Sequence, residues 1–291
     1  LSSKSRMKTL IKKEISEDLT KYSDDRMSPL KERAMAVAMD ESELTTNEPT
    51  TVILSKKGWT RAAKGHDLDP AALQYKSGDS FKASAQGKSN QQAIFLDSTG
   101  RSYSLPAHTL PSARGQGEPI SGRVAPPSGA TFEGVVVGDE QTDILIASDA
   151  GYGFVCQVTD LISNKKSGKA VLRCPKGAKL LASLLVQDYK KDWVVSVSNE
   201  GRMLIFPISE LPRLSKGKGN KIINIPAKRV TERVEFVTAM AVLSKDSLLT
   251  IYAGRRHHNL KPSDLDHYRG EPMLEVGVGR GGSALTMAYS T

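Results

Sequence analysis

The feature that most constrains the fold is a unit that recurs five times beyond residue 50. Each copy has an apolar, β-rich segment, a short turn with a glycine and a second apolar segment. The copies are TVILSKKGWT (51–60), AIFLDSTGRSYS (93–104), DILIASDAGYGF (143–154), VVSVSNEGRMLI (194–205) and LLTIYAGRRHHNL (248–260). The turn glycines are Gly58, Gly100, Gly151, Gly201 and Gly254, at steps of 42, 51, 50 and 53 residues. Periods near 50 are typical of propeller blades with about four strands each.

A second signal follows each turn at a fixed distance. A leucine lies ten residues after each of the first four glycines and eleven after the fifth, at Leu68, Leu110, Leu161, Leu211 and Leu265. This regularity argues against a chance likeness among unrelated hairpins. One small antiparallel sheet cannot cover its own apolar face, so neighbouring units must pack together. We therefore predict an all-β, five-bladed propeller over residues 47–291, with approximate blades 51–92, 93–142, 143–193, 194–246 and 247–291.

The segment before the repeats has a different pattern. Its apolar residues recur at steps of three and four, as expected for one face of a helix: Met7, Leu10, Ile11, Ile15, Leu19 and Tyr22. Ser28-Pro29 ends or kinks this pattern, and a second helical stretch is predicted over Leu30–Met39. The stripe fits an amphipathic helix resting on a neighbouring domain, or a short coiled-coil seam. We predict that residues 1–46 form a helical connector, and the initial Leu1 indicates a fragment of a longer protein.

The net charge of +9 is confined to the repeats. Residues 1–46 hold nine basic and nine acidic side chains, so they contribute nothing to it. Loops with glycine follow the repeat leucines, and most are basic: YKSGDS, SARGQGEP, NKKSGKA, LSKGKGNK and HYRGEP. Glycine allows close approach of a backbone to a phosphate, and Lys or Arg neutralises it. We predict a basic track along the blade rim, with these candidates: Lys56, Lys57, Arg61, Lys64, Arg101, Arg114, Lys165, Lys166, Lys169, Arg202, Lys216, Lys218, Lys221, Arg255 and Arg256.

Patterns for nucleotide or metal chemistry fail on inspection. GVGRGG at 277–282 fits G-x-G-x-x-G but is followed by only nine residues, with no βαβ unit. Lys169 follows a glycine, but Ser163 and Ala170 stand where a P-loop needs Gly and Ser/Thr. His66 and His108 share a repeat position, which favours a turn-stabilising role over a metal site. We expect no catalytic, cofactor or metal site in this chain.

The two cysteines and two tryptophans also have plain interpretations. Cys156 and Cys174 cannot form a disulfide framework and favour a reducing cytoplasm. Both are predicted to be core thiols, and Trp59 and Trp193 are predicted to be core side chains. No apolar run approaches the ~18–20 residues that span a membrane. A signal-peptide h-region is also missing from the first residues.

Several segments resemble one known family. KGHDLD (64–69), LPSARGQGEP (110–119), ASDAGYGF (147–154) and LSKGKGNKIINIP (214–226) are similar to the C-terminal domain of topoisomerase IV A subunits, type IIA topoisomerases related to gyrase A. LIKKEISEDLTKYSDDR (10–26) resembles the segment where the DNA-cleaving core of this family ends. The resemblance implies a β-pinwheel, in which propeller-like blades exchange strands and a basic rim binds and bends duplex DNA.

The resemblance also implies partners and limits. It implies an accessory role in decatenation and relaxation, because SARGQGEP and LSKGKGNK are only degenerate forms of the gyrase box for chiral wrapping. The catalytic tyrosine lies in an upstream domain of the family, and no A-x-R-Y-T segment occurs here. ATP and Mg would act on other domains or subunits. Implied partners are double-stranded DNA, a condensin-like chromosome-organising protein, the B subunit of topoisomerase IV and a second copy of its A subunit. The implied location is the cytoplasm, at the nucleoid.

Two other function classes remain open from the residues alone. The first is a propeller scaffold that binds proteins. The second is an enzyme with a site in the central channel of the propeller, which requires convergent titratable groups near the ring axis.

Overall fold

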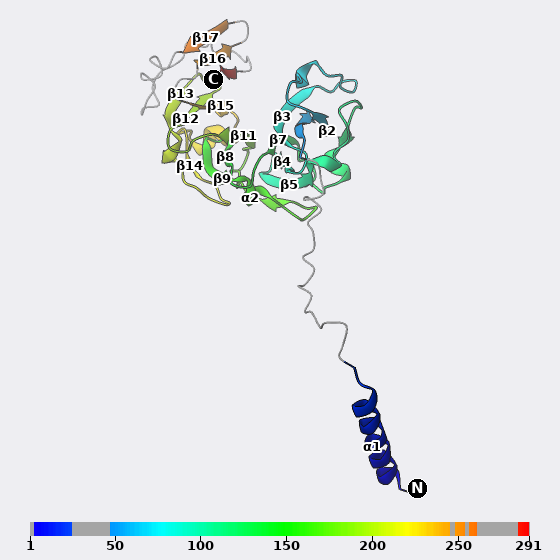
Figure 1. The fold of residues 1–291 in the computed structure, drawn as a ribbon. Helices are drawn as coiled ribbons and strands as arrows, with labels where there is room; N and C mark the ends of the chain where they lie inside the picture. Colours follow the sequence, from blue (N-terminus) through cyan, green and yellow to red (C-terminus); the bar gives the residue numbers. More distant parts are fainter. Residues whose placement is uncertain (1–2, 25–46, 245–247, 254–255, 261–284, 291) are drawn as a thin grey trace. The chain divides into compact units, whose positions relative to one another are not determined.

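A computed structural model of the chain describes residues 3–24, 47–244, 248–253, 256–260 and 285–290 (Figure 1). The chain divides into two compact units, residues 1–40 and 41–291, which are described separately. The predicted boundary between a connector and the repeat domain at residue 46 falls outside the described residues and stays a prediction. So does the second predicted helix over residues 30–39.

The first unit contains the helix α1 (Lys4–Tyr22), as predicted. Ser23 ends it in an extended conformation, and its backbone N–H donates to the carbonyl oxygen of Leu19 over 3.0 Å. Each of the six stripe residues named above is between 45% and 70% exposed. The helix therefore presents an uncovered apolar stripe within this unit.

The second unit is built of small antiparallel sheets that follow the repeats in order. Each predicted apolar pair forms a hairpin, and the first four hairpins turn at Gly58, Gly100, Gly151 and Gly201. The hairpins are β1 (Pro49–Ser55) with β2 (Trp59–Lys64), β4 (Gln92–Asp97) with β5 (Arg101–Pro106), β8 (Asp143–Ser148) with β9 (Tyr152–Gln157), β12 (Trp193–Ser198) with β13 (Met203–Pro207), and β16 (Leu248–Ala253) with β17 (Arg256–Leu260). A third strand pairs with the first strand of each hairpin: β3 (Phe81–Lys88), β7 (Phe132–Val137), β11 (Leu180–Val186), β15 (Val237–Leu243) and β18 (Leu285–Ser290).

The first three sheets gain a fourth strand from the next repeat. Their strand orders are β3-β1-β2-β6, β10-β5-β4-β7 and β11-β8-β9-β14. The exchanged strands have two residues each: β6 (Glu118–Pro119), β10 (Lys169–Ala170) and β14 (Asn220–Lys221). Each comes from the chain that follows the next hairpin or its helical turn. This exchange confirms the pinwheel arrangement that the resemblance implies.

Three of the repeat leucines lie at the end of a short helical turn. Leu110 follows η2 (Ala107–Thr109), Leu161 is the last residue of α2 (Val158–Leu161), and Leu211 follows η4 (Ile208–Glu210). Other short turns in the described residues are η1 (Pro70–Ala72), η3 (Ile120–Gly122) and α3 (Ala227–Thr231). Leu110, Leu161 and Leu211 are at most 7% exposed, whereas Leu68 is half-buried. The residue before the leucine fixes the turn in the second and third repeats. Thr109 Oγ1 donates to Pro106 O, and Asp160 accepts from the N–H of Gln157.

Apolar layers between consecutive sheets form the core. Along β4, Ala93 and Phe95 pack toward the first sheet, while Ile94 and Leu96 pack toward the third. This alternation is the period of two of a strand, and burial on both faces explains why the strands appear in the sequence as continuous apolar runs. Complete burial of a side chain such as Phe95 contributes about 1.5–3 kcal/mol.

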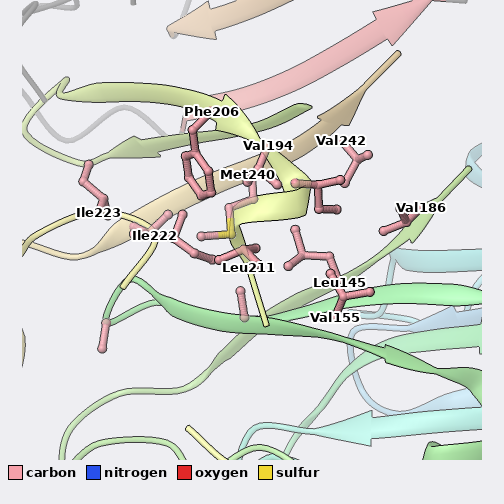
Figure 2. Packing of buried hydrophobic residues seen from close by; sticks show 14 of the residues in the cluster. Leu145, Val155, Val186, Val194, Phe206, Leu211, Ile222, Ile223, Met240 and Val242 are labelled. Carbon is pink, nitrogen blue, oxygen red and sulfur yellow. The ribbon is translucent and has the colours of Figure 1, made fainter. Parts of the chain in front are cut away.

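The layer between the third and fourth sheets follows the same rule. Figure 2 shows Leu145 and Val155 on one side of it and Val194, Phe206 and Met240 on the other. A further layer joins the fourth sheet to β16, where Leu249 and Ile251 are buried. Apolar clusters therefore connect each sheet to the next one in the chain.

The prediction of an all-β, propeller-like domain behind a short helix is confirmed. The described residues give four blades rather than the predicted five. The fifth repeat supplies a three-stranded sheet, β17-β16-β18, and the rest of that repeat lies outside the described residues. The fourth blade has three described strands, β13-β12-β15.

Candidate nucleic-acid interface

The candidate interface is built on the segments that lead into the exchanged strands. We call residues 112–117, 163–168 and 214–219 the exchange loops. Each ends in a glycine with positive φ, namely Gly117 (83°), Gly168 (69°) and Gly219 (75°). A Cβ on Gly219 would lie 2.0 Å from the carbonyl oxygen of Gly153, and one on Gly117 would lie 2.3 Å from that of Thr60. Close packing on the preceding blade therefore requires glycine at these positions.

One backbone hydrogen bond then closes each exchange. The residue after the exchanged strand donates its N–H to the turn glycine of the preceding blade. The pairs are Ile120 with Gly58 (3.0 Å), Val171 with Gly100 (3.0 Å) and Ile222 with Gly151 (2.8 Å). All three donors are buried apolar residues. The path of each exchange loop is therefore fixed at its C-terminal end.

The second and third exchange loops are also hydrogen-bonded to the chain that follows the preceding exchanged strand. The carbonyl oxygen of Lys166, fourth in its loop, accepts from Ala125 N–H at 2.7 Å. Gly217 is fourth in the next loop and accepts from Arg173 N–H at the same distance. Gly217 also donates to Val171 O over 2.8 Å. The chain after one exchanged strand thus supports the next exchange loop, which sets the spacing of the loops from blade to blade.

Seven of the fifteen predicted basic residues are exposed on these loops or on a hairpin turn, and Lys221 is exposed on the exchanged strand β14. The exposed members are Lys56, Lys57, Arg114, Lys165, Lys166, Lys216, Lys218 and Lys221. Arg173, which the sequence prediction did not single out, is also exposed beside Gly217. Because the second and third exchange loops are hydrogen-bonded to the chain after the preceding exchanged strand, the charges on these loops have fixed backbone positions.

Arg61 does not fit the predicted track, because it is only 4% exposed. Its Nη1 donates to the carbonyl oxygen of Gly115 over 2.9 Å, and its guanidinium lies 4.7 Å from the ring centroid of Tyr75. The side chain thus connects β2, the first exchange loop and the loop around Tyr75. Arg61 holds the interface loop in place and is not available to solvent.

Three other predicted residues are half-buried and bonded within the protein. Arg101 Nη1 donates to Ser167 O over 2.9 Å, and Lys169 Nζ donates to Asp160 O over 2.6 Å. Arg202 pairs with the buried carboxylate of Glu235, and its Nη2 also donates to Asn224 O over 3.1 Å. These side chains fix loops to blades, so their charges are partly neutralised by contacts within the protein and are less available to a ligand.

The remaining predicted residues lie elsewhere. Lys64 is at the far end of β2, where it pairs with Glu48 at 2.7 Å. Arg256 belongs to β17, but its side chain is not described, and Arg255 lies outside the described residues.

Two lysines of the interface lie over aromatic rings. Lys218 Nζ is 3.7 Å from the ring centroid of Tyr152, and Lys76 Nζ is 3.4 Å from that of Trp59. Trp59 is half-buried and carries this lysine on its face, so its interpretation as an ordinary core residue is incomplete. Sequence reasoning missed Lys76, although the basic loop YKSGDS that contains it was recognised. The signal was an aromatic residue directly after the turn glycine in the first and third repeats.

His66 and the two cysteines behave as structural groups. His66 Nε2 lies 3.0 Å from Gly87 O, next to the end of β2. Burial raises the pKa of the Cys156 and Cys174 thiols to about 12, with nearby aspartates acting in the same direction. The described part of the chain holds no group of three or more His, Cys, Asp or Glu side chains suited to a metal ion. Among the same residues, no helix is long and apolar enough to cross a membrane.

Comparison with known proteins agrees with this architecture. The family model of the DNA gyrase C-terminal domain, a β-propeller, matches residues 142–187 and 192–244. The chain is 55% identical to the A subunit of DNA topoisomerase 4 from Pseudomonas aeruginosa over 93% of its length, and 50% identical to that from Haemophilus influenzae over its whole length. The solved C-terminal domain of E. coli ParC superposes with a TM-score of 0.72 at 44% identity, covering 84% of this chain and 99% of that one.

The strand-exchanged blades and these likenesses define the class first: a β-pinwheel of the gyrase and topoisomerase IV type. Within that class, the chain belongs to the family of C-terminal domains of topoisomerase IV A subunits. It spans 36% and 38% of the length of the two curated relatives.

Proposed function

We propose that this domain binds duplex DNA along its exchange loops and bends it. The observation that carries the proposal is the set of backbone hydrogen bonds that ties the second and third exchange loops to the chain after the preceding exchanged strand, because it gives the exposed lysines of these loops fixed backbone positions. A duplex carries one phosphate charge per ~1.7 Å of axis, so an ordered row of cations is a suitable partner. Phosphates would be read and base edges would not, since the loops offer charge and backbone N–H groups.

Bending follows from the placement of the loops on successive blades. Deforming a 20–30 bp duplex costs roughly 1–6 kcal/mol. Several Lys or Arg contacts to phosphates, made on one curved surface, offset this cost. A rigid set of loops is favourable here, because the protein loses little conformational entropy when the duplex binds.

The role within a larger enzyme is a further part of this proposal. The domain would present a transported duplex to a topoisomerase IV assembly during decatenation and supercoil relaxation. Other domains and subunits of the assembly would cleave the DNA and bind ATP and Mg. These other subunits would be one of B type and a second of A type. The expected location is the cytoplasm, at the nucleoid. A condensin-like chromosome-organising protein would be a further partner, as the family resemblance implies.

Duplex binding over a salt series tests the proposal. A fluorescently labelled 30 bp duplex is titrated with the full 291-residue chain, and log affinity is plotted against log salt concentration. We expect a linear decrease with a slope near −0.9 for each neutralised phosphate. The proposal is overturned if binding is absent or does not depend on salt.

Charge reversal tests whether cations on the exchange loops bind the duplex. The triple variant R114E/K216E/K218E removes exposed cations from two exchange loops. Its control, the single variant K190E, changes an exposed lysine in the loop between β11 and β12. Loss of DNA affinity in the triple variant, with retained affinity in the control, supports the proposal. Unchanged DNA affinity in the triple variant contradicts it.

A further inference from the structure

The position after the turn glycine differs in character from blade to blade. In the first and third blades it holds an aromatic residue, Trp59 or Tyr152, and each ring carries a lysine. In the second and fourth blades it holds Arg101 or Arg202, whose guanidinium is bonded to protein oxygens. The residue at this position is therefore either an aromatic ring that holds a lysine or an arginine that is already bonded within the protein.

The two lysines reach their rings from different parts of the chain. Lys218 comes from the third exchange loop, between Gly217 and Gly219. Lys76 comes from the loop between η1 and β3 of the same repeat as Trp59. The same pairing has thus been built twice from unrelated loops, which makes an accidental side-chain contact a poor explanation.

The backbone around each lysine is held firmly. Gly219 packs against Gly153 O, and the adjacent Lys221 pairs with Tyr152 in the β9–β14 ladder. Around Lys76, a turn closes through a 2.8 Å hydrogen bond from Asp79 N–H to Lys76 O, with Gly78 in the left-handed region. Both lysines are exposed on their outer side.

We infer that Tyr152 and Trp59 are positioning residues that hold Lys218 and Lys76 in place to bind phosphate. This inference rests on the proposed DNA-binding function. A lysine ammonium has three N–H donors, and a ring covers only one side of it, so the others stay free for phosphate oxygens. A free lysine loses rotamer entropy when it binds, and a lysine already held over a ring loses less.

A double-mutant cycle on the pair Tyr152 and Lys218 tests the inference. Tyr152→Leu should weaken duplex binding by about two- to five-fold, the range expected for an exposed cation–π contact. Tyr152→Phe should retain the affinity, because phenylalanine keeps the ring. In the Lys218→Ala background, Tyr152→Leu should cause no further loss, since the ring acts through the lysine. Equal losses for Phe and Leu, or additive losses in the double variant, would overturn the inference.

A second measurement does not depend on DNA. In ¹H–¹³C spectra of the free protein, the ε-methylene protons of Lys218 should be shifted upfield by the ring and return to ordinary positions in Tyr152→Leu. The same comparison applies to Lys76 with Trp59→Leu. If the upfield shifts are absent, the inference is wrong, whatever the result of the DNA-binding experiment. If the shifts are present and the wild-type chain binds no duplex, the failure lies with the proposed function, and the positioning role falls with it.

Discussion

The backbone N–H of Ile222 donates a 2.8 Å hydrogen bond to the carbonyl oxygen of Gly151, the turn glycine of the preceding blade. Gly151 has φ +77°, so it both closes its own hairpin and receives the exchanged chain. Ile222 is 1% exposed, and its side chain enters the layer between the third and fourth sheets. One contact therefore connects turn geometry, strand exchange and core packing.

Gly219→Ala should be strongly destabilising. The added Cβ would lie 2.0 Å from Gly153 O, at a residue with φ +75°. Left-handed strain alone costs about 1–2 kcal/mol, and relief of the clash must displace the exchanged strand, so we expect a total loss of roughly 2–4 kcal/mol. Urea unfolding measures it. Gly129→Ala, where φ is +78° and the new Cβ meets nothing within 4 Å, is the matched control, and equal effects would contradict the packing argument.

Arg61→Met should loosen the first exchange loop. The variant removes the donor to Gly115 O and the contact with Tyr75, while it retains most of the buried apolar volume. Trypsin should then cleave after Arg114 faster than in the wild-type chain, because local opening exposes the loop more often. Lys64→Met, which removes only an exposed ion pair, serves as the control. Equal cleavage rates in the two variants would show that Arg61 does not hold this loop.

Lys216→Ala and Arg202→Gln should distinguish a cation that binds DNA from a cation that stabilises the fold. Lys216 is exposed, so its removal should reduce the salt slope of duplex binding by about 0.9 and leave stability within about 0.5 kcal/mol. Arg202→Gln leaves the carboxylate of Glu235, which is 4% exposed, with one partner fewer. It should lower the free energy of unfolding by about 1–3 kcal/mol while the salt slope is retained. The opposite pattern would mean that Arg202 contacts DNA directly.

The two thiols should make stability decline at alkaline pH. Burial raises the pKa of Cys156 and Cys174 from the ordinary 9.0 to about 12. Because the folded pKa lies above the unfolded value, the stabilisation is complete below pH 9 and is lost as pH rises toward 12. Urea midpoints between about pH 8 and pH 11 measure this effect, and C156A/C174A should show a smaller decline. Rapid reaction of both thiols with a disulfide reagent in the native state, at a pH of about 8, would contradict the prediction.

The hairpins could be predicted from the sequence because their signals are local. Continuous apolar runs flank each turn glycine, and the first four of these glycines are all left-handed in the structure, as a tight hairpin requires. The apolar stripe from Met7 to Tyr22 likewise has the period of a helix. The number of complete blades was harder to predict from the sequence, because a complete blade needs residues from the following repeat.

The strand exchange and the roles of individual cations could not be predicted in the same way. An exchanged strand such as Asn220–Lys221 has two residues, which is too short to show any periodicity. Arg61 and Lys218 look alike in the sequence, because each is a cation in or near a glycine-containing segment. Their roles differ because of residues far away in the sequence: Arg61 is bonded to Gly115, whereas Lys218 lies over Tyr152. The position of the candidate interface was therefore predictable, whereas the roles within it depend on packing.

Strand exchange has a consequence for synthesis on the ribosome. The first blade needs Glu118–Pro119, and the third needs Asn220–Lys221, so the hairpin at the centre of each blade is translated well before its fourth strand. A growing chain therefore completes each of the first three blades one repeat late, and each of these sheets keeps an unpaired edge until its fourth strand has been translated. Folding that proceeds from the N-terminus during translation would move this open edge along the nascent domain one blade at a time.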